Sequence, residues 1–565
     1  METFCPPPPR PWLARSWWRS EISAGAPTLL TIVLAWVVWL VGLRGVDQAA
    51  QAYRVIEFRA HGFMLWDAGW YGGNFPMGYS VLFPTIAAVF GLAAVAIASA
   101  GLATWSFDRV VSHHLGARPL GTWYFCISTL LPVAIGQLPF LAGEALGLAS
   151  LVALQKRRRL IAVPLGLLAA LCSPLAAAFL AMVCLAWAAH SSRGRPWLVA
   201  TASASLAVIA VIAVLFPGDG PMPFPWTGLV VTELLCLTVL TPLVRTTPVV
   251  RLGALIYAAA TFFSFLVPNP LGGNAPRLAA SIGVPLLACF VTAPGPVLDR
   301  LSGARVVSRL TGGRRLQFGP RWRVAAVAMV IPFIVWQWAP GQKIVTTNDA
   351  PATQASFYQP LLDEIAALQT GPIRIEVVPT FDHWEAAFVA PHVSLARGWE
   401  RQLDVADNPI FYTPGLLTPS AYESWLDTNG ISYVALPATR LDYSGHLEAQ
   451  LLQMGQVPDL TPVWQTPQWQ LWKVTGSPGL VSGPATLTSV APDHLALQVE
   501  RPGQLTVRVR YNAYWTVTEG AACLSRNPGG WISVDAHTAG TLLLSTSVLR
   551  PAGAPPPYCV SSPES

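Results

Sequence analysis

Residues 27–43, PTLLTIVLAWVVWLVGL, form an apolar run without a charged side chain. About 20 such residues cross the hydrocarbon core of a bilayer as a helix, so this run predicts a membrane span. Further apolar runs follow at 80–104, 120–136, 139–155, 160–172, 174–189, 197–215, 226–243, 252–267, 278–293 and 324–339. Several are short, which favours tilted helices or re-entrant pairs. The runs predict an all-α polytopic membrane bundle of about eleven transmembrane helices.

Composition supports a membrane protein. Of 565 residues, 53% are hydrophobic and 11% are charged, and the mean hydropathy is +0.46. An ordinary soluble protein of this length is far more polar. The net charge of +6 comes from short basic clusters between apolar runs, which indicate membrane orientation and not a nucleic-acid partner. The sequence contains no P-loop, dinucleotide fingerprint, HExxH, CxxC or GxSxG pattern. Soluble nucleotide chemistry and zinc-dependent hydrolysis therefore have no support.

Basic side chains occupy alternate connections between the runs, and they mark the cytoplasmic side. They are Arg10, Arg15 and Arg19, then Lys156 to Arg159, Arg193 with Arg195, Arg245 with Arg251, and the cluster from Arg300 to Arg323. This pattern predicts a multi-pass protein of the plasma membrane with a cytoplasmic N-terminus and an extracytoplasmic C-terminal part. A cleaved signal peptide before the small residues of 47–52 is an alternative that leaves these sides unchanged.

The composition changes after the last apolar run, and this divides the chain. We predict a cytoplasmic tail over 1–26, a transmembrane domain over 27–340 with its first extracytoplasmic loop at 45–79, an α/β domain over 341–478 and a β-sandwich-like domain over 479–565. The α/β prediction rests on helical patterns at 357–369 and 420–430 and on strand patterns at 373–380 and 431–437. The sandwich prediction rests on short alternating strands at 494–500, 504–511, 531–536 and 541–549.

Two cysteines fall in aqueous, extracytoplasmic positions under this topology. Cys523 and Cys559 are therefore predicted to form a disulfide. Most other cysteines lie in apolar runs, where a lone thiol is usually a small hydrophobic side chain, and Cys5 lies in the predicted cytoplasmic tail.

The first loop continues as HGFMLWDAGWYGGNFPMGYSVLFP over 61–84, which holds one carboxylate, Asp67. A carboxylate near the bilayer surface suits a catalytic base, and the flanking Trp66, Trp70 and Tyr71 suit the headgroup region or the face of a sugar. The alternative is an interfacial loop in which Asp67 only caps a turn.

A second external loop, VPNPLGGNAPR at 267–277, ends in Arg277 at the mouth of a span. An arginine fork there can hold a phosphate at headgroup depth, assisted by Asn274 and by backbone amides at the paired glycines. The alternative is an arginine that only anchors the span.

Other polar side chains on the same side complete the candidate substrate site. They are Glu57 and His61 in the first loop, Glu144 in an apolar run, and Trp399 with Arg401 in a polar, aromatic segment of the α/β domain. This segment is predicted to fold back on the membrane face. Its acidic and histidine side chains match no standard metal-ligand spacing, so no metal site is predicted.

Four stretches resemble the GT-C superfamily of membrane glycosyltransferases, in its actinobacterial, YfhO-like type. They are WDAGWYGG with PMGYSVLFP at 66–84, GQLPFLAGEALGL at 136–148, NPLGGNAPRLA at 269–279 and WERQLDVADNPIFY at 399–412. The resemblance implies inverting transfer of a sugar, arabinofuranose or mannose, from a polyprenyl-phosphate donor to a cell-envelope glycan or glycolipid acceptor. Asp67 would be the base, and Arg277 would hold the phosphate.

The sequence departs from the family pattern at one point. Many such enzymes have two adjacent or nearby acidic residues in the first loop, whereas here Glu57 stands ten positions before Asp67. This leaves open whether a divalent cation, Mg²⁺ or Mn²⁺, takes part. Two alternatives to the transferase are a lipid or polysaccharide transporter and an inactive relative that binds glycan. A transporter favours internal repeats, which the sequence does not show.

Overall fold

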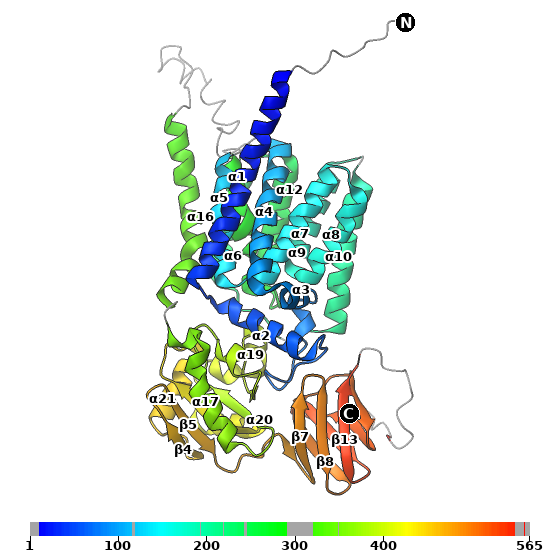
Figure 1. Ribbon diagram of the computed structural model, residues 1–565, viewed down its shortest axis with the longest axis vertical. Coiled ribbons are helices and arrows are strands. Elements are labelled where there is room, and N and C mark those ends of the chain that lie inside the picture. The colour runs from blue at the N-terminus through cyan, green and yellow to red at the C-terminus, as the bar shows by residue number, and fades with distance from the viewer. Residues whose placement is uncertain are drawn as a thin grey trace.

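The computed structural model describes residues 11–115, 119–192, 194–218, 220–241, 246–290, 320–347, 350–547 and 559. Its N-terminal part is a helical bundle, and its C-terminal part contains two sheet-rich units beneath that bundle (Figure 1). The first ten residues of the predicted tail, Arg193, Arg245 and the basic cluster up to Arg315 lie outside the described residues.

Each predicted apolar run falls mainly on helices in its described residues. The bundle contains α1 (Pro11–Val41), α3 (Phe83–Phe90), α4 (Leu92–Leu115), α5 (Pro119–Ser128), α6 (Leu130–Ile135), α7 (Leu138–Gln155), α8 (Arg159–Cys172), α9 (Pro174–Ala189), α10 (Arg195–Leu215), α11 (Trp226–Leu240), α12 (Pro248–Leu266), the π-helix η3 (Ala279–Gly283), α13 (Val284–Phe290) and α16 (Pro320–Thr347). The helical character of the runs is therefore confirmed.

The number of spans remains a prediction. In the described part of the chain, three helices (α7, α10 and α12) are long and apolar enough to cross a membrane, or up to five if each bent pair is one span. The predicted run 80–104 is not one straight helix, because α3 and α4 meet at an angle of 114°. Gly91, with φ +88°, ends α3 in a backbone conformation that favours glycine.

The predicted first loop begins with a helix that its sequence pattern had not indicated. This helix, α2 (Val46–His61), turns by 85° from the last residues of α1 and lies across the base of the bundle (Figure 1). Its buried face carries several polar side chains, including Asp47, Arg54 and Glu57. Such side chains need partners. Arg54 pairs with Glu400 of the α/β unit, whereas Asp47 pairs with Arg277 after α12.

The α/β unit is built on a five-stranded sheet in the order β2-β1-β3-β5-β4. The strands β1 (Arg374–Val377), β2 (Ser394–Leu395) and β3 (Ile431–Pro437) are parallel, whereas β4 (Leu460–Gln465) and β5 (Trp469–Val474) are antiparallel to their neighbours. The helices are α17 (Ala355–Leu368), α18 (Glu385–Phe388), α19 (Arg401–Asp407), α20 (Pro419–Asn429) and α21 (His446–Gln453). The predicted elements at α17, β1, α20 and β3 are confirmed, and α20 ends at Gly430 with φ +63°.

The second unit has two four-stranded antiparallel sheets, ordered β10-β13-β8-β7 and β11-β12-β9-β6. Their strands are β6 (Val481–Ser482), β7 (Ala485–Ala491), β8 (His494–Val499), β9 (Gly503–Arg510), β10 (Trp515–Glu519), β11 (Ala522–Arg526), β12 (Trp531–Ala536) and β13 (Gly540–Thr546). Both sheets contribute to one apolar core, with Leu497 and Leu544 from one and Val507 and Ile532 from the other. The predicted strands β8, β9, β12 and β13 are confirmed, and the other four had not been predicted.

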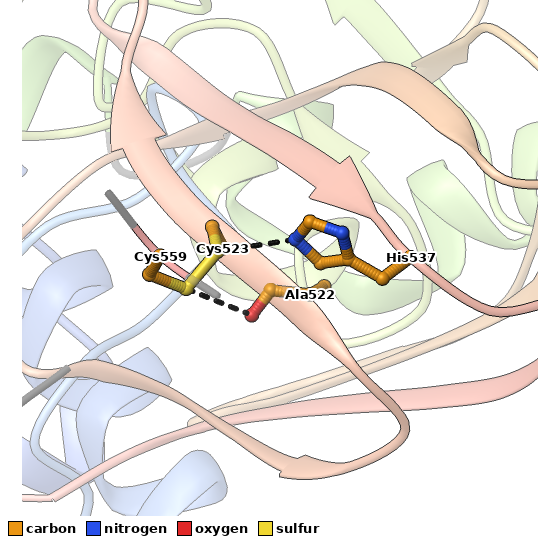
Figure 2. Close-up of a disulfide and its surroundings, with 4 residues drawn as sticks. All are labelled: Ala522, Cys523, His537 and Cys559. Carbon is orange, nitrogen blue, oxygen red and sulfur yellow. Dashed lines mark hydrogen bonds between the residues drawn. A yellow bond between two sulfur atoms is a disulfide. The ribbon is translucent and has the colours of Figure 1, made fainter. Parts of the chain in front are cut away.

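The predicted disulfide is present. Cys523 on β11 is bonded to Cys559, with their Cα atoms 5.5 Å apart (Figure 2). The His537 ring lies beside this bond, with Nε2 3.3 Å from the sulfur of Cys523. The bond therefore fixes Cys559 to the edge strand β11.

Short helical turns complete the described elements. They are the 3₁₀ turns η1 (Pro76–Gly78), η2 (Gly272–Asn274), η4 (Pro351–Thr353), η5 (Pro409–Phe411) and η6 (Tyr443–Gly445).

Candidate active site at the membrane face

The loop over 66–74 forms a wall between the bundle and the two sheet-rich units. It closes through paired backbone hydrogen bonds between Asp67 and Asn74, 3.0 and 2.9 Å long. Both units bind its backbone, because the β2 amide of Leu395 donates to Gly69 O and the β9 amide of Arg510 donates to Gly72 O. The loop is thus held from two sides.

The aromatic side chains of this loop are buried. Trp66, Trp70 and Tyr71 are 4%, 1% and 2% exposed. Trp70 stacks on Tyr53 of α2 with ring centroids 4.4 Å apart, and the Tyr71 hydroxyl donates to Glu400 O over 3.0 Å. Of these three predicted substrate contacts, only Trp66 borders either of the two cavities described below.

One face of the wall carries Asp67 and borders a cavity of about 410 Å³, here named the junction cavity. Asp67 Oδ1 accepts hydrogen bonds from the Tyr53 hydroxyl at 2.9 Å and from the Gly69 amide at 2.8 Å. Burial raises the pKa of Asp67, although both hydrogen bonds favour the charged form. Glu57 and His61 line the same cavity, so the structure brings these three predicted residues together.

The opposite face borders a larger cavity of about 650 Å³, here named the juxtamembrane cavity. Its walls come from the 66–74 loop, α7, α10, the connection after α12, the start of α19 and the end of β9. Its polar lining includes Asn74, Tyr79, Asn274, Arg277, Glu400, Asp407 and Arg510. The predicted phosphate ligands Asn274 and Arg277 therefore share one cavity, but Asp67 lies in the other.

Arg277 has an acidic partner that the sequence reasoning missed. Its Nη2 lies 3.3 Å from Oδ2 of Asp47, in the first turn of α2. Burial raises the pKa of Asp47, and the charge of Arg277 opposes that shift. The turn before Arg277 needs glycine, because Gly272 has φ +38° and an added Cβ would lie 1.9 Å from Met222 O.

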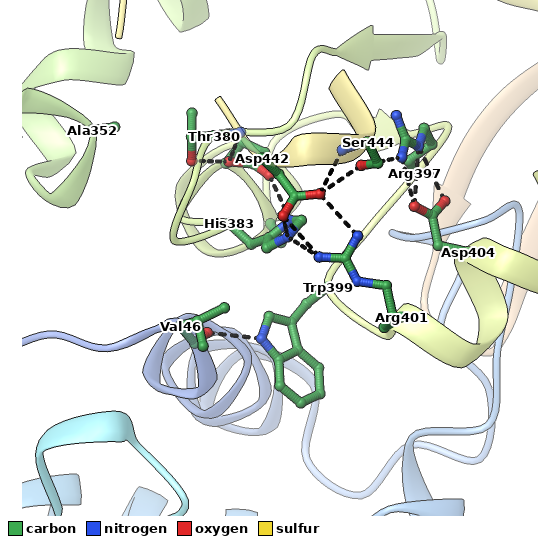
Figure 3. Close-up of polar contacts among 12 residues, drawn as sticks. Val46, Ala352, Thr380, His383, Arg397, Trp399, Arg401, Asp404, Asp442 and Ser444 are labelled. Atoms are coloured by element: carbon green, nitrogen blue, oxygen red, sulfur yellow. Dashed lines mark hydrogen bonds and ion pairs between the residues drawn. The ribbon is translucent and has the colours of Figure 1, made fainter. Parts of the chain in front are cut away.

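A second ion pair closes the same cavity from the α/β unit. Arg54 of α2 contacts the carboxylate of Glu400, and both side chains are buried. The Arg54 guanidinium also lies over the ring of Tyr79, 4.2 Å from its centroid. Burial raises the pKa of Glu400, whereas Arg54 favours its charged form. The predicted contact Trp399 donates from its indole to Val46 O at 2.7 Å, which ties this segment to α2 (Figure 3).

Arg401 belongs to an internal network instead of a cavity wall. Figure 3 shows its guanidinium paired with both carboxylate oxygens of Asp442, each at 2.9 Å. Nearby, Arg397 pairs with Asp404 at 2.7 Å. The segment does fold back toward α2, but Arg401 is occupied in stabilising it and lines neither cavity.

The predicted contact Glu144 and a second carboxylate of the bundle, Glu233, have separate surroundings. Glu144 on α7 borders a small cavity of about 40 Å³ with Leu278 and Ile282, and it does not line the juxtamembrane cavity. Glu233 on α11 accepts a hydrogen bond from the Thr261 hydroxyl at 2.7 Å. Among the described residues, no group of three or more His, Cys, Asp or Glu side chains is placed to hold a metal ion.

The sequence did contain a signal for Asp47. It follows the first apolar run by only four residues, after Arg44, on the side predicted to hold Arg277. An acidic side chain at the end of one span and an arginine at the end of another are candidates for an ion pair. The aromatic loop drew attention to Asp67 instead.

No protein-family model and no curated protein sequence matches this chain. Among solved structures, the arabinofuranosyltransferase AftD from Mycobacteria, mutant R1389S, aligns over 91% of this chain and 59% of its own length, with 13% identity and a TM-score of 0.40. ArnT from Cupriavidus metallidurans in the apo state aligns over 80% of this chain and 98% of its own, with 15% identity and a TM-score of 0.40. Similarity at this level does not establish a shared activity, and the chain spans well under two thirds of AftD.

Proposed function

We propose that this chain is a membrane glycosyltransferase that transfers a sugar from a polyprenyl-phosphate donor to a cell-envelope glycan or glycolipid. The supporting observation is that a cationic site and an apolar cavity meet at one point of the chain. Arg277 lines the juxtamembrane cavity, and the next residue, Leu278, lines an apolar cavity of about 280 Å³ inside the bundle.

The apolar cavity suits the lipid part of such a donor. It lies among α4, α7, α9, α11, α12 and η3, and nearly all of its lining atoms are apolar. Ala279 and Ile282 of the π-helix η3 continue its wall from Leu278. A molecule with an anionic head and a hydrocarbon tail satisfies both environments, whereas a soluble sugar nucleotide leaves the apolar part unused.

The reaction follows from the polar groups around Arg277. Arg277 and Asn274 bind the donor phosphate and stabilise its charge as it leaves. Asp47 is the base that we propose, because it is the carboxylate nearest to Arg277 and keeps some solvent access, with 11% of its side chain exposed. The acceptor hydroxyl loses its proton to Asp47, its oxygen forms the new bond to the anomeric carbon, and the bond from that carbon to the phosphate oxygen breaks. A single displacement of this kind inverts the anomeric centre.

The acceptor reaches the site from the extracytoplasmic side. This side is assigned by the positive-inside pattern, which puts the N-terminus in the cytoplasm and the two C-terminal units outside. The sugars to test first are arabinofuranose and mannose.

The test uses the full chain in nanodiscs with polyprenyl-phosphate arabinofuranose or polyprenyl-phosphate mannose carrying a labelled sugar. We expect transfer to an envelope-glycan acceptor by the wild type, and its loss in Arg277→Ala. Arg501→Ala, at an exposed position of the sandwich unit, is the matched control and should transfer normally. Unchanged transfer by Arg277→Ala, or no transfer by any of these proteins, would refute the proposal.

A further inference from the structure

The junction cavity is a second polar site, separated from the donor site by the 66–74 wall. Three parts of the chain build it: α2 with the first loop, the β2 side of the α/β unit, and the edge strand β7 of the sandwich unit. Its volume of about 410 Å³ falls in the range of about 300 to 1,000 Å³ that is typical of small-molecule pockets. The proposed transfer reaction uses none of its residues.

The cavity wall holds a buried acid. Glu57 is 5% exposed and lines the cavity, and its one ion-pair contact among the described residues is with His61. The His61 ring lies on the same wall, with Nε2 3.7 Å from Oε2 of Glu57. The Glu57 oxygens are not among the fully enclosed polar atoms, so they face the cavity, where the hydrogen-bond donors of a ligand can reach them. Asp67 stands on the same wall and uses Oδ1 for Tyr53 and Gly69.

The charge of the cavity limits the kind of ligand. No Lys or Arg is among the described residues that line it, so a phosphate or carboxylate ligand has no permanently charged cation to meet there. Burial and the nearby charge of Asp67 raise the pKa of Glu57 to about 7, and the cavity therefore resists holding two full negative charges at neutral pH. An uncharged ligand with many donors fits these conditions.

We infer that the junction cavity binds an uncharged, hydroxyl-rich glycan, through hydrogen bonds from sugar hydroxyls to Glu57 and Asp67. Each sugar residue brings several hydroxyl donors, whereas a peptide strand brings one backbone donor per residue. Pro372, Pro391 and Pro492 add apolar surface that suits the C–H face of a sugar ring. This site goes beyond the proposed transfer, because it binds glycan without the lipid donor and on the other side of the wall.

The test measures glycan binding to the full chain in nanodiscs with no donor present, by saturation-transfer NMR and calorimetry. The probes are arabinotriose and mannotriose as neutral glycans, trigalacturonate as an acidic glycan and trialanine as a peptide. Ser489→Trp, at an exposed β7 position on the cavity wall, should fill the cavity without touching the acids. Thr486→Trp, exposed on the same strand but outside the lining, is the matched control.

We expect at least one neutral trisaccharide to bind, Ser489→Trp to weaken it tenfold or more, and Thr486→Trp to leave it unchanged. Trigalacturonate and trialanine should not bind. The inference is overturned if neither neutral trisaccharide binds, if Ser489→Trp binds as the wild type does, or if the acid or the peptide binds equally well. Arg277→Ala should keep its glycan binding, so failure of the donor site and failure of this site give different results.

Discussion

The two faces of the 66–74 wall differ in the charge that they present. The junction cavity has two acids, Glu57 and Asp67, and no Lys or Arg among the described residues that line it. The juxtamembrane cavity has Arg277, Arg510 and Arg526 in its lining beside the acids Glu400 and Asp407, and Leu278, next to Arg277, lines an apolar cavity within the bundle. A few residues of one loop therefore separate a site suited to an anionic lipid head from a site suited to hydroxyl groups. The charge of each cavity lining therefore indicates which ligand it suits better than the position of a residue in the loop does.

The largest effect should come from Asp47→Asn. Loss of a general base costs on the order of 10² to 10⁴ in rate, so we expect the transfer rate to fall about 10³-fold with donor binding retained. Asp67→Asn, on the other face, should stay within about threefold of the wild type. Initial rates with labelled donor measure both variants. The reverse pattern would return the role of the base to Asp67.

Arg54→Ala should mainly affect stability. It leaves Glu400 buried without its cation, and breaking a buried pair in this way costs roughly 3–5 kcal/mol. Thermal unfolding of the detergent-solubilised protein should show a clear loss, and the double variant Arg54→Ala with Glu400→Gln should recover part of it. A midpoint equal to that of the wild type would show that this ion pair does not secure the juxtamembrane side.

Two glycines test the faces separately. A Cβ at Gly73, which has φ +134°, would lie 2.3 Å from the Trp66 ring, and a Cβ at Gly69 would lie 2.1 Å from the Tyr53 hydroxyl. Each substitution to alanine should cost about 1–3 kcal/mol in folding free energy. We expect Gly73→Ala to weaken donor binding and Gly69→Ala to weaken trisaccharide binding. If both variants lose donor affinity and trisaccharide affinity equally, the two faces of the 66–74 wall are not independent.

The smallest effect concerns pH. The pKa of Glu57 rises from 4.5 to about 7 on folding, so the folded state binds more protons than the unfolded state between these values. Stability from this group is present below pH 4.5 and is lost as the pH rises through 7. Glu57→Gln should remove that loss, so its unfolding midpoint should change less between pH 5 and pH 8 than that of the wild type. An identical pH dependence would contradict the buried, protonated state of Glu57.

Much of the fold could be predicted from local sequence patterns. Apolar runs located the bundle helices, and periodicity located α17, α20, β1 and β3, because these elements bury one face or a short apolar segment. The short strands β6, β7, β10 and β11 were missed, since their sequences lack a clear alternation. The bend at Gly91 and the helix α2 were also missed, because their positions depend on packing against distant parts of the chain.

The candidate site was harder to predict, because its partners are far apart in the sequence. Arg277 pairs with Asp47, 230 positions away, and Arg54 pairs with Glu400, 346 positions away. The aromatic loop predicted exposed contacts at Trp70 and Tyr71, yet two units cover it in the folded chain. Residue type indicated which side chains carry chemistry, but only tertiary packing decided which of them share a cavity.

The central claim is that the Arg277 face, and not the Asp67 face, binds the phosphate of a lipid donor. The most direct measurement is the affinity of the nanodisc protein for a polyprenyl phosphate without sugar, compared among the wild type, Arg277→Ala and Asp67→Asn. A charged hydrogen bond to phosphate is worth about 1.5–3 kcal/mol, so Arg277→Ala should weaken binding at least tenfold. Asp67→Asn should bind within twofold of the wild type. Wild-type affinity in Arg277→Ala, or a greater loss in Asp67→Asn, would contradict the account.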